Sequence, residues 1–270
     1  YETETAIIEA AAVMPALQAG EYDGSAALWR GEEREAFMLY SEAYLENRLV
    51  LVGRSGSDVS AARFADIAGR RLAVVGTYSY GAALEGDPGP ELVHGASLQE
   101  NLTRLLAGEV DYMLIDELVI AHIRQHYADE AAERLAIGDN ALITRTLHFT
   151  LRDDHPDAEA IMVAFNREVL EMLADGSYNR VLGLEWIRAD IDGDGRLDYV
   201  HAGGPVGPEQ PKDSFAVMAL VNPQAEPAGE GSYYMAGRNY QDWEEVPHGD
   251  RDPARYREKE DAAGIFGLEF

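Results

Sequence analysis

Residues 66–84 read DIAGRRLAVVGTYSYGAAL, and this stretch predicts how the chain folds. Arg71–Val75 is a short apolar run rich in β-branched residues, which is typical of a buried strand. Gly76–Gly81 reads as a turn bounded by glycines, and a short helix is expected from Ala82 onward. A strand, a turn and a helix in this order form one unit of an alternating α/β arrangement.

The alternation continues on both sides of this stretch. Further strands are expected at 23–29, 49–53, 110–115 and 142–151, and further helices at 5–19, 97–106, 118–127 and 158–173. Ser97 and Glu100 form a capping box at the start of one helix, and Gly20 and Gly108 are typical C-terminal caps. Strands that alternate with helices predict an α/β fold with a parallel sheet.

The sequence changes in character after Val200. Residues 202–232 are rich in Pro, Gly and Glu, and one strand-like run at 215–221 interrupts them. Residues 233–247 favour a small aromatic hairpin. We therefore expect residues 201–270 to form a C-terminal extension with little regular structure.

The chain is strongly acidic, with 49 Asp and Glu against 22 Lys and Arg and a formal net charge of −27. Such a charge repels phosphate backbones and anionic lipid surfaces, which argues against nucleic-acid binding and against docking to a membrane through basic residues. The alternative interpretation is that the acidity serves solubility alone.

The sequence contains no cysteine, which excludes a disulfide framework, a thiolate nucleophile and cysteine-ligated zinc. No apolar run approaches the roughly 20 residues that a membrane-spanning helix needs. The sequence opens with Tyr1 and shows no signal peptide, so we interpret the N-terminus as processed or truncated.

Residues 190–198 read DIDGDGRLD, a pattern that predicts a calcium loop. Oxygen ligands at alternate positions on a tight turn suit calcium, which takes about six to eight oxygens. The expected ligands are the carboxylates of Asp190, Asp192, Asp194 and Asp198 and the backbone carbonyl of Arg196. His201 stands at the twelfth place, where an EF-hand has Glu, so the loop is not a standard EF-hand. A solvated acidic turn is the alternative.

Several segments, taken in order, resemble a known family. They are ALQAGEYDG at 16–24, GEER at 31–34, YSEAY at 40–44, the stretch 66–84, LLAGEVDYMLIDELVIAHI at 105–123, and the segment 147–186 that begins LHFTLRDDHPDAEA. Together they resemble the amino-acid-binding branch of the type II periplasmic solute-binding proteins of ABC importers. The resemblance covers about residues 5–188.

The resemblance implies an α/β fold of two lobes, the Venus flytrap, joined by two hinge strands. The hinge strands would be Leu49–Gly53 and His148–Leu151. Lobe one would comprise residues 1–53 and 147–200, and lobe two residues 54–146. A small solute that touches both lobes would favour the closed state by its differential affinity.

The resemblance also implies a location and a partner. Such a protein is periplasmic, carries a signal peptide upstream, and passes an amino-acid-like solute to an ABC permease or a signalling partner at the membrane. The family begins with a strand and a helix that we do not find here, and the run at 215–221 is a candidate replacement strand.

Two charged residues match the positions at which the family binds the two ends of an amino acid. Arg34 matches the guanidinium that binds the carboxylate, since a planar fork can form two parallel hydrogen bonds. Asp116 matches the acid that receives the ammonium group, at the end of a predicted strand. The alternatives are that Arg34 pairs with Glu32, Glu33 or another surface acid, and that Asp116 caps the following helix.

A loop and one aromatic residue complete the implied binding site. Thr77, Tyr78 and Ser79 match the family's carboxylate-binding loop, where Gly76 allows close approach at a helix N-terminus. Just before Arg34 this chain has apolar residues where the family usually has small hydroxyls. Trp29 could stack on the solute, but it could equally be a core residue.

No catalytic motif is evident, so we expect a binding protein. Because some dehydratases resemble these binders, an enzyme on the same scaffold is an alternative, with Glu117 beside Asp116 as its general acid. A second alternative is a sensor or a calcium-stabilised interaction module with a vestigial cleft. His122 and His126 have the spacing of metal ligands on a helix, but we interpret them as surface histidines.

Overall fold

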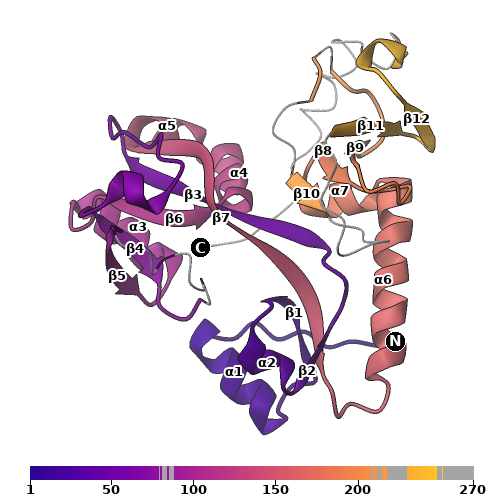
Figure 1. Ribbon diagram of the computed structural model, residues 1–270, viewed down its shortest axis with the longest axis horizontal. Coiled ribbons are helices and arrows are strands. Elements are labelled where there is room, and N and C mark those ends of the chain that lie inside the picture. The colour runs from indigo at the N-terminus through magenta and orange to yellow at the C-terminus, as the bar shows by residue number, and fades with distance from the viewer. Residues whose placement is uncertain are drawn as a thin grey trace. The chain divides into compact units, whose positions relative to one another are not determined.

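The computed structural model describes residues 1–78, 80, 84, 88–207, 209–211, 215–217, 230–247 and 251 (Figure 1). The helix expected from Ala82 falls largely outside these residues. Within them, no helix is both long enough and apolar enough to cross a membrane.

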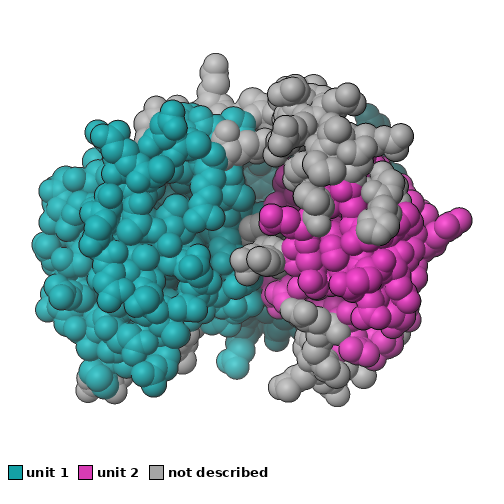
Figure 2. Space-filling model, turned by 90° about the horizontal axis from the view of Figure 1, so that it is seen from above, with its two compact units in different colours: residues 1–38, 47–147 teal, residues 39–46, 148–270 magenta. Residues whose placement is uncertain are grey.

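Contacts between residues divide the chain into two compact units, which Figure 2 colours separately. The first unit comprises residues 1–38 and 47–147, and the second comprises residues 39–46 and 148–270. This division differs from the two lobes expected from the sequence, and those lobe boundaries stay a prediction.

The first unit holds most of the helices and strands that the sequence predicts. It contains α1 (Ala10–Ala19), β1 (Gly24–Trp29), α2 (Glu32–Glu35), the 3-10 helix η1 (Phe64–Ile67), β4 (Arg71–Val75), β5 (Glu91–Gly95), α3 (Leu98–Ala107), β6 (Tyr112–Asp116), α4 (Glu117–His126) and α5 (Ala128–Arg134). Three strands contain points where the chain passes from one unit to the other, namely β2 (Met38–Tyr40), β3 (Leu45–Arg54) and β7 (Leu135–Arg152). β5 was not expected from the sequence.

These strands form one seven-stranded sheet in the order β1-β7-β3-β6-β4-β5, with β2 paired to β7. β4 runs parallel to both β5 and β6, as the alternation of strands and helices predicts. β3 runs antiparallel to β6, with Leu49 opposite Asp116 and Gly53 opposite Tyr112. The sheet is therefore mixed, and the expectation of a parallel sheet is wrong for β3. β3 and β6 are not consecutive strands, since β4 and β5 lie between them, and the rule that a helix between two strands makes them parallel applies to consecutive strands.

Both faces of this sheet are buried, and β3 shows how. Leu49 and Leu51 belong to one hydrophobic cluster, whereas Val50 and Val52 belong to another. Successive side chains of a strand point to opposite faces, so a continuous apolar run supplies both clusters at once. The apolar stretch in β3 thus fixes a strand in the interior of the unit.

The helix ends follow from local chemistry. Ser97 caps α3 by accepting a hydrogen bond from the Glu100 backbone N–H at 3.1 Å. Gly20 and Gly108 end α1 and α3 in the left-handed conformation, at φ values of 74° and 77°. Glycine adopts this conformation without steric cost, so the predicted caps are confirmed.

The second unit combines two helices with a smaller sheet. It contains α6 (Ala158–Asp175), α7 (Ser177–Leu182), β8 (Trp186–Ala189), β9 (Leu197–His201), β10 (Phe215–Val217), β11 (Glu230–Met235), β12 (Arg238–Tyr240) and the 3-10 helix η3 (Trp243–Glu245). The sheet has the order β10-β8-β9-β11-β12. Tyr199, Tyr233 and Trp243 form the centre of its hydrophobic cluster.

Three short strands of this sheet, β10, β11 and β12, come from the C-terminal extension, residues 201–270. The expectation that the extension has little regular structure stays a prediction, since much of it lies outside the described residues. The aromatic residues supply the apolar surface that these short strands need, and β11 and β12 form the predicted hairpin. Phe215–Val217 pairs with β8, which falls within the residues predicted for lobe one, and does not join the seven-stranded sheet that contains β1; its role as a replacement strand stays a prediction.

Candidate functional site

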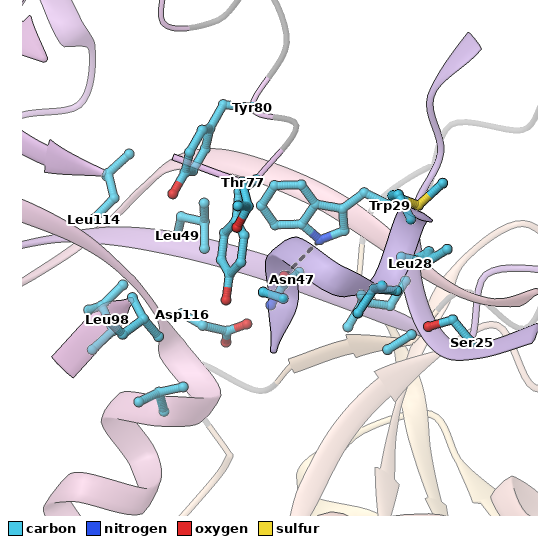
Figure 3. A pocket seen from close by; sticks show the side chains of 18 of the residues that line it. Ser25, Leu28, Trp29, Asn47, Leu49, Thr77, Tyr80, Leu98, Leu114 and Asp116 are labelled. Carbon is cyan, nitrogen blue, oxygen red and sulfur yellow. Dashed lines mark hydrogen bonds between the residues drawn. The ribbon is translucent and has the colours of Figure 1, made fainter. Parts of the chain in front are cut away.

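A pocket of about 340 Å³ lies in the first unit (Figure 3). Figure 3 shows Asp116 and Leu98 on one side of the pocket, Leu28 and Ser25 on the other, and Trp29, Asn47 and Thr77 between them. The lining residues are Ala10, Val13, Met14, Ser25, Ala27, Leu28, Trp29, Arg34, Asn47, Leu49, Thr77, Tyr78, Tyr80, Leu98, Leu114, Ile115, Asp116, Val119 and Leu147. The volume is at the small end of the range for ligand pockets.

Arg34 lies in α2, a single helical turn where the sequence predicted only a polar turn. Its backbone N–H donates to the Gly31 carbonyl at 2.9 Å, which closes that turn. The side chain is buried, with 8% exposed, and its guanidinium donates to the Trp29 carbonyl at 3.0 Å. Arg34 lines the pocket, which fits the ligand-binding interpretation of this residue.

Asp116 is the last residue of β6 and the N-cap of α4. Its Oδ1 accepts a hydrogen bond from the Leu118 backbone N–H at 2.7 Å. The pKa of this carboxyl is raised to about 6, chiefly by burial; the Leu118 hydrogen bond opposes the rise and the charge of Glu117 adds to it. Asp116 therefore both caps a helix and lines the pocket, so the two interpretations of the sequence are compatible.

The loop after β4 contributes Thr77 and Tyr78 to the pocket. Burial, and then the charge of Asp116, raise the pKa of the Tyr78 hydroxyl. Gly76 is not a lining residue of the pocket. Its backbone N–H donates to the Gly95 carbonyl at 2.9 Å and so is used within the protein. Ser79 and most of the expected helix after it lie outside the described residues.

Trp29 serves as a core residue and as a wall of the pocket. It is 7% exposed, belongs to the hydrophobic cluster of the sheet, and lines the pocket. Its indole N–H donates to Asn47 Oδ1 at 2.8 Å, and its ring meets Tyr78 and Tyr80 edge-on at centroid distances of 5.5 and 5.8 Å. These contacts hold the ring in one orientation.

Sequence reasoning missed the part of the wall that α1 supplies. Ala10, Val13 and Met14 are spaced three and four residues apart, so they share one helix face, and all three line the pocket. The spacing was visible in the sequence as an ordinary apolar stripe. Nothing in the sequence distinguishes a stripe that faces a cavity from one that is filled by neighbouring side chains.

The acidic loop lies in the second unit, between β8 and β9. Oxygen atoms of Asp190, Asp192 and Asp194 all lie within 4.8 Å of one another. Asp198 Oδ1 accepts hydrogen bonds from the backbone N–H and the hydroxyl of Ser232 at 2.8 and 2.7 Å. Arg196 donates its backbone N–H to Asp194 Oδ1 at 2.8 Å. The fold thus brings together three of the four predicted carboxylates, and Asp198 and the Arg196 carbonyl stay predicted ligands.

The Asp190 side chain organises this loop. Its two oxygens accept the backbone N–H groups of Gly193 and Gly195 at 2.7 and 3.0 Å. Both glycines have positive φ values, of 78° and 82°, which few other residues adopt. The three convergent carboxylates are hard oxygen donors of the kind calcium prefers, so these residues fit the ion.

Two groups considered for catalysis or metal binding have other partners. Glu117 forms an ion pair with Arg48 at 3.2 Å and is not a lining residue of the pocket. His122 and His126 stack on α4 with ring centroids 4.2 Å apart, and His126 Nδ1 lies 3.0 Å from the His122 carbonyl oxygen. A general acid at Glu117 would first have to leave this ion pair.

The fold is that of the two-lobed periplasmic binding proteins, and it is similar to several solved structures. A substrate-binding protein of an amino acid ABC transporter, AbpA from Streptococcus pneumoniae bound to L-arginine, is 16% identical with a TM-score of 0.55; the alignment covers 67% of this chain and 74% of that one. An arginine 3rd transport system periplasmic binding protein from Legionella pneumophila is 23% identical with a TM-score of 0.53, covering 64% and 76%. The GluR0 ligand-binding core from Nostoc punctiforme, in complex with L-glutamate, is 18% identical with a TM-score of 0.50, covering 63% and 75%.

Residues 1–188 match the family described as bacterial extracellular solute-binding proteins, family 3, and the chain belongs to this family. A comparison with curated proteins finds no match. The resemblance read from the sequence is therefore confirmed at the level of family and fold. The similarity to solved structures, at these identities, establishes the fold alone.

Proposed function

We propose that this protein is an extracytoplasmic receptor that binds a free amino acid in the pocket of its first unit and delivers it to an ABC importer. One observation carries the proposal: Arg34 and Asp116, far apart in the sequence and opposite in charge, line the same pocket. A zwitterionic ligand presents the two complementary charges. The family and the amino acids bound in the similar structures support the same function.

Each end of the ligand has a partner of suitable chemistry. The guanidinium of Arg34 can bind a carboxylate through parallel hydrogen bonds, and the carboxylate of Asp116 can accept from an ammonium group. A buried charge without a counter-ion is unfavourable, as the raised pKa of Asp116 shows. An ammonium group beside Asp116 would offset that penalty, so binding favours the ionised carboxylate.

A calorimetric screen of the standard L-amino acids tests the proposal. At least one should bind, and Arg34→Met should weaken it by roughly 10-fold or more, the effect of losing a hydrogen bond to a charged group. Arg30→Met is the matched control, because Arg30 is exposed, pairs with Glu35 at 3.8 Å and is not a lining residue of the pocket. Equal affinity in all three proteins would refute the role of Arg34.

Delivery to an importer is tested in cells that carry or lack the gene. Uptake of the bound amino acid, labelled with a radioisotope, should fall when the gene is deleted, and the protein should appear in the extracytoplasmic fraction. Binding without any uptake defect would instead favour the sensor interpretation, in which the ligand signals through another partner.

The proposal includes no catalysis. An enzyme using Glu117 as its acid would have to break the ion pair with Arg48. Prolonged incubation of the purified protein with its bound amino acid, followed by mass spectrometry, should return the amino acid unchanged. A stoichiometric excess of any product would revive the enzyme interpretation.

We also infer that the acidic loop binds a structural calcium ion, with Asp190, Asp192 and Asp194 as carboxylate ligands. The convergence of three carboxylates supports this, since their mutual repulsion is relieved by a cation. Asp198 and the Arg196 carbonyl stay predicted ligands. The ion would hold the turn between β8 and β9 in place and supply no catalytic chemistry.

Calcium titration in the presence of chelator tests this site. Calcium should raise Tm, by mass action on the folded state, and an Asp192→Asn, Asp194→Asn variant should lose most of the increase. Asp153→Asn, Asp154→Asn, a pair of similar charge outside the loop, is the control for net charge. An identical increase in the two variants would argue against the site.

A further inference from the structure

We infer that the ligand is an α-amino acid whose side chain is uncharged and mainly apolar. The inference rests on the proposed function and narrows it. The inferred ligand differs from those of two similar structures, which hold L-arginine and L-glutamate, both with charged side chains. The lining of the pocket carries the argument.

The two charged residues of the pocket are matched by the α-carboxylate and the α-ammonium group that every free amino acid carries. Among the described lining residues, Arg34 is the one cation and Asp116 the one anion. The ligand's carboxylate and ammonium groups pair with these two. An arginine or glutamate side chain would bring a third charge into the pocket with no counter-charge among the described lining residues, and such burial is strongly unfavourable.

The next acid along the chain is held away from the pocket. Glu117 follows Asp116 directly, but its carboxylate pairs with Arg48 at 3.2 Å. Neither residue lines the pocket. A basic ligand side chain therefore gains no partner from this ion pair unless the pair first separates.

Two flanks of the pocket offer apolar surface to a ligand. On one flank, Val13 and Met14 of α1 and Leu28 of β1 are partly exposed and line the cavity. On the other flank, Leu98 of α3 and Val119 of α4 do the same. These five side chains keep some accessible surface, whereas Leu49 and Leu114 behind them are buried. An apolar ligand side chain between the flanks would remove this surface from water.

Two polar groups of the lining have partners within the protein. The Tyr80 hydroxyl oxygen accepts the Val75 backbone N–H at 2.9 Å, and Asn47 Oδ1 accepts the Trp29 indole N–H at 2.8 Å. Both contacts leave less hydrogen-bonding capacity for a polar ligand side chain, which agrees with the apolar flanks.

A homologous series of unbranched amino acids tests the inference. Glycine, alanine, 2-aminobutyrate, norvaline and norleucine share both charged ends and add one carbon at a time. Each added CH2 that is buried contributes about 0.8 kcal/mol, which is about fourfold in affinity. Calorimetry should therefore show Kd falling about fourfold per carbon until the pocket is filled, with norleucine tighter than L-arginine and L-glutamate.

A pocket variant locates the effect. Leu28→Ala should weaken norleucine several-fold and leave glycine within about twofold, because glycine does not reach the flank. Leu106→Ala, at an exposed position outside the pocket lining, is the control and should change neither ligand.

The outcomes separate the two proposals. A flat homologous series, or tighter binding of L-arginine or L-glutamate than of norleucine, would overturn the apolar ligand class and leave an amino-acid receptor in place. If no amino acid binds, charged or apolar, the proposed function itself fails. A graded series with the expected response of Leu28→Ala supports the inference.

Discussion

Replacing Asp116 by Asn should make the protein more stable and a worse receptor at the same time. Asn has nearly the same shape as Asp and is an equally good N-cap, so its side-chain oxygen can still accept the Leu118 N–H that Asp116 accepts at 2.7 Å. The variant therefore removes the charge and retains the helix cap.

The magnitude follows from the raised pKa. Burial moves the pKa of Asp116 from its ordinary 3.8 to about 6, so ionising this group is harder in the folded protein than in the unfolded chain. A difference of this size corresponds to about 3 kcal/mol. Because the folded pKa is the higher one, Asp116 costs little below about pH 4, and the penalty grows as pH rises through 6.

Urea unfolding of the ligand-free protein at several pH values measures this effect. At pH 7.5, Asp116→Asn should raise the free energy of unfolding by about 3 kcal/mol, and at pH 4 the difference should shrink to roughly 0.6 kcal/mol. Affinity for the amino acid should fall by roughly 10- to 100-fold at pH 7.5, because the ammonium group loses its charged partner. Asp139→Asn, at an exposed position, controls for net charge.

A stability difference that is absent at pH 7.5, or equal at both pH values, would refute the assignment of a buried charge to Asp116. If Asp116→Asn gains stability but keeps its affinity for the amino acid, the burial of the charge is supported and its contact with the ligand is not. The carboxylate would then be buried, as the structure shows, without contacting the ligand.

Three further predictions follow from other contacts. Affinity of the native protein for a zwitterionic amino acid should fall roughly tenfold from pH 7.5 to pH 5, where roughly a tenth of a carboxyl with a pKa of about 6 stays ionised; a flat profile would contradict this. Ligand addition should change tryptophan fluorescence, and Trp29→Phe should abolish the change, because Trp186 and Trp243 belong to the second unit; a retained signal would place the ligand elsewhere. Gly138→Ala should lower stability by about 1–3 kcal/mol in urea unfolding, since its Cβ would lie 2.6 Å from the Val59 carbonyl oxygen; an unaffected variant would contradict that packing.

Much of the fold could be predicted because its causes are local. The run Arg71–Val75 is short, apolar and bounded by turn residues, and it forms β4 as expected. Gly108 ends α3 because a left-handed cap is a property of a few adjacent residues. The reversed direction of β3 was not predictable in this way, since pairing with β6 joins residues that no local rule connects.

The candidate site was predicted in part. Arg34, Thr77 and Asp116 were matched by a resemblance to a family, and the structure places all three in one pocket. The α1 wall with Met14 was missed, because an amphipathic stripe has the same spacing whether it faces a core or a cavity. For Asp198 of the acidic loop, the structure adds a partner that the sequence does not indicate, since Ser232, far along the chain, donates both hydrogen bonds to its Oδ1.

By itself, the amino-acid sequence determined the features that depend on neighbours along the chain: the alternation of strands and helices, their caps, the excess of negative charge and the family. The tertiary structure decided which of these features meet. That Arg34 and Asp116 line one cavity, with apolar flanks from α1 and α4, follows from long-range packing. The role proposed for these two residues rests on their burial, because a charge inside a pocket, unlike one in water, favours a ligand of opposite charge.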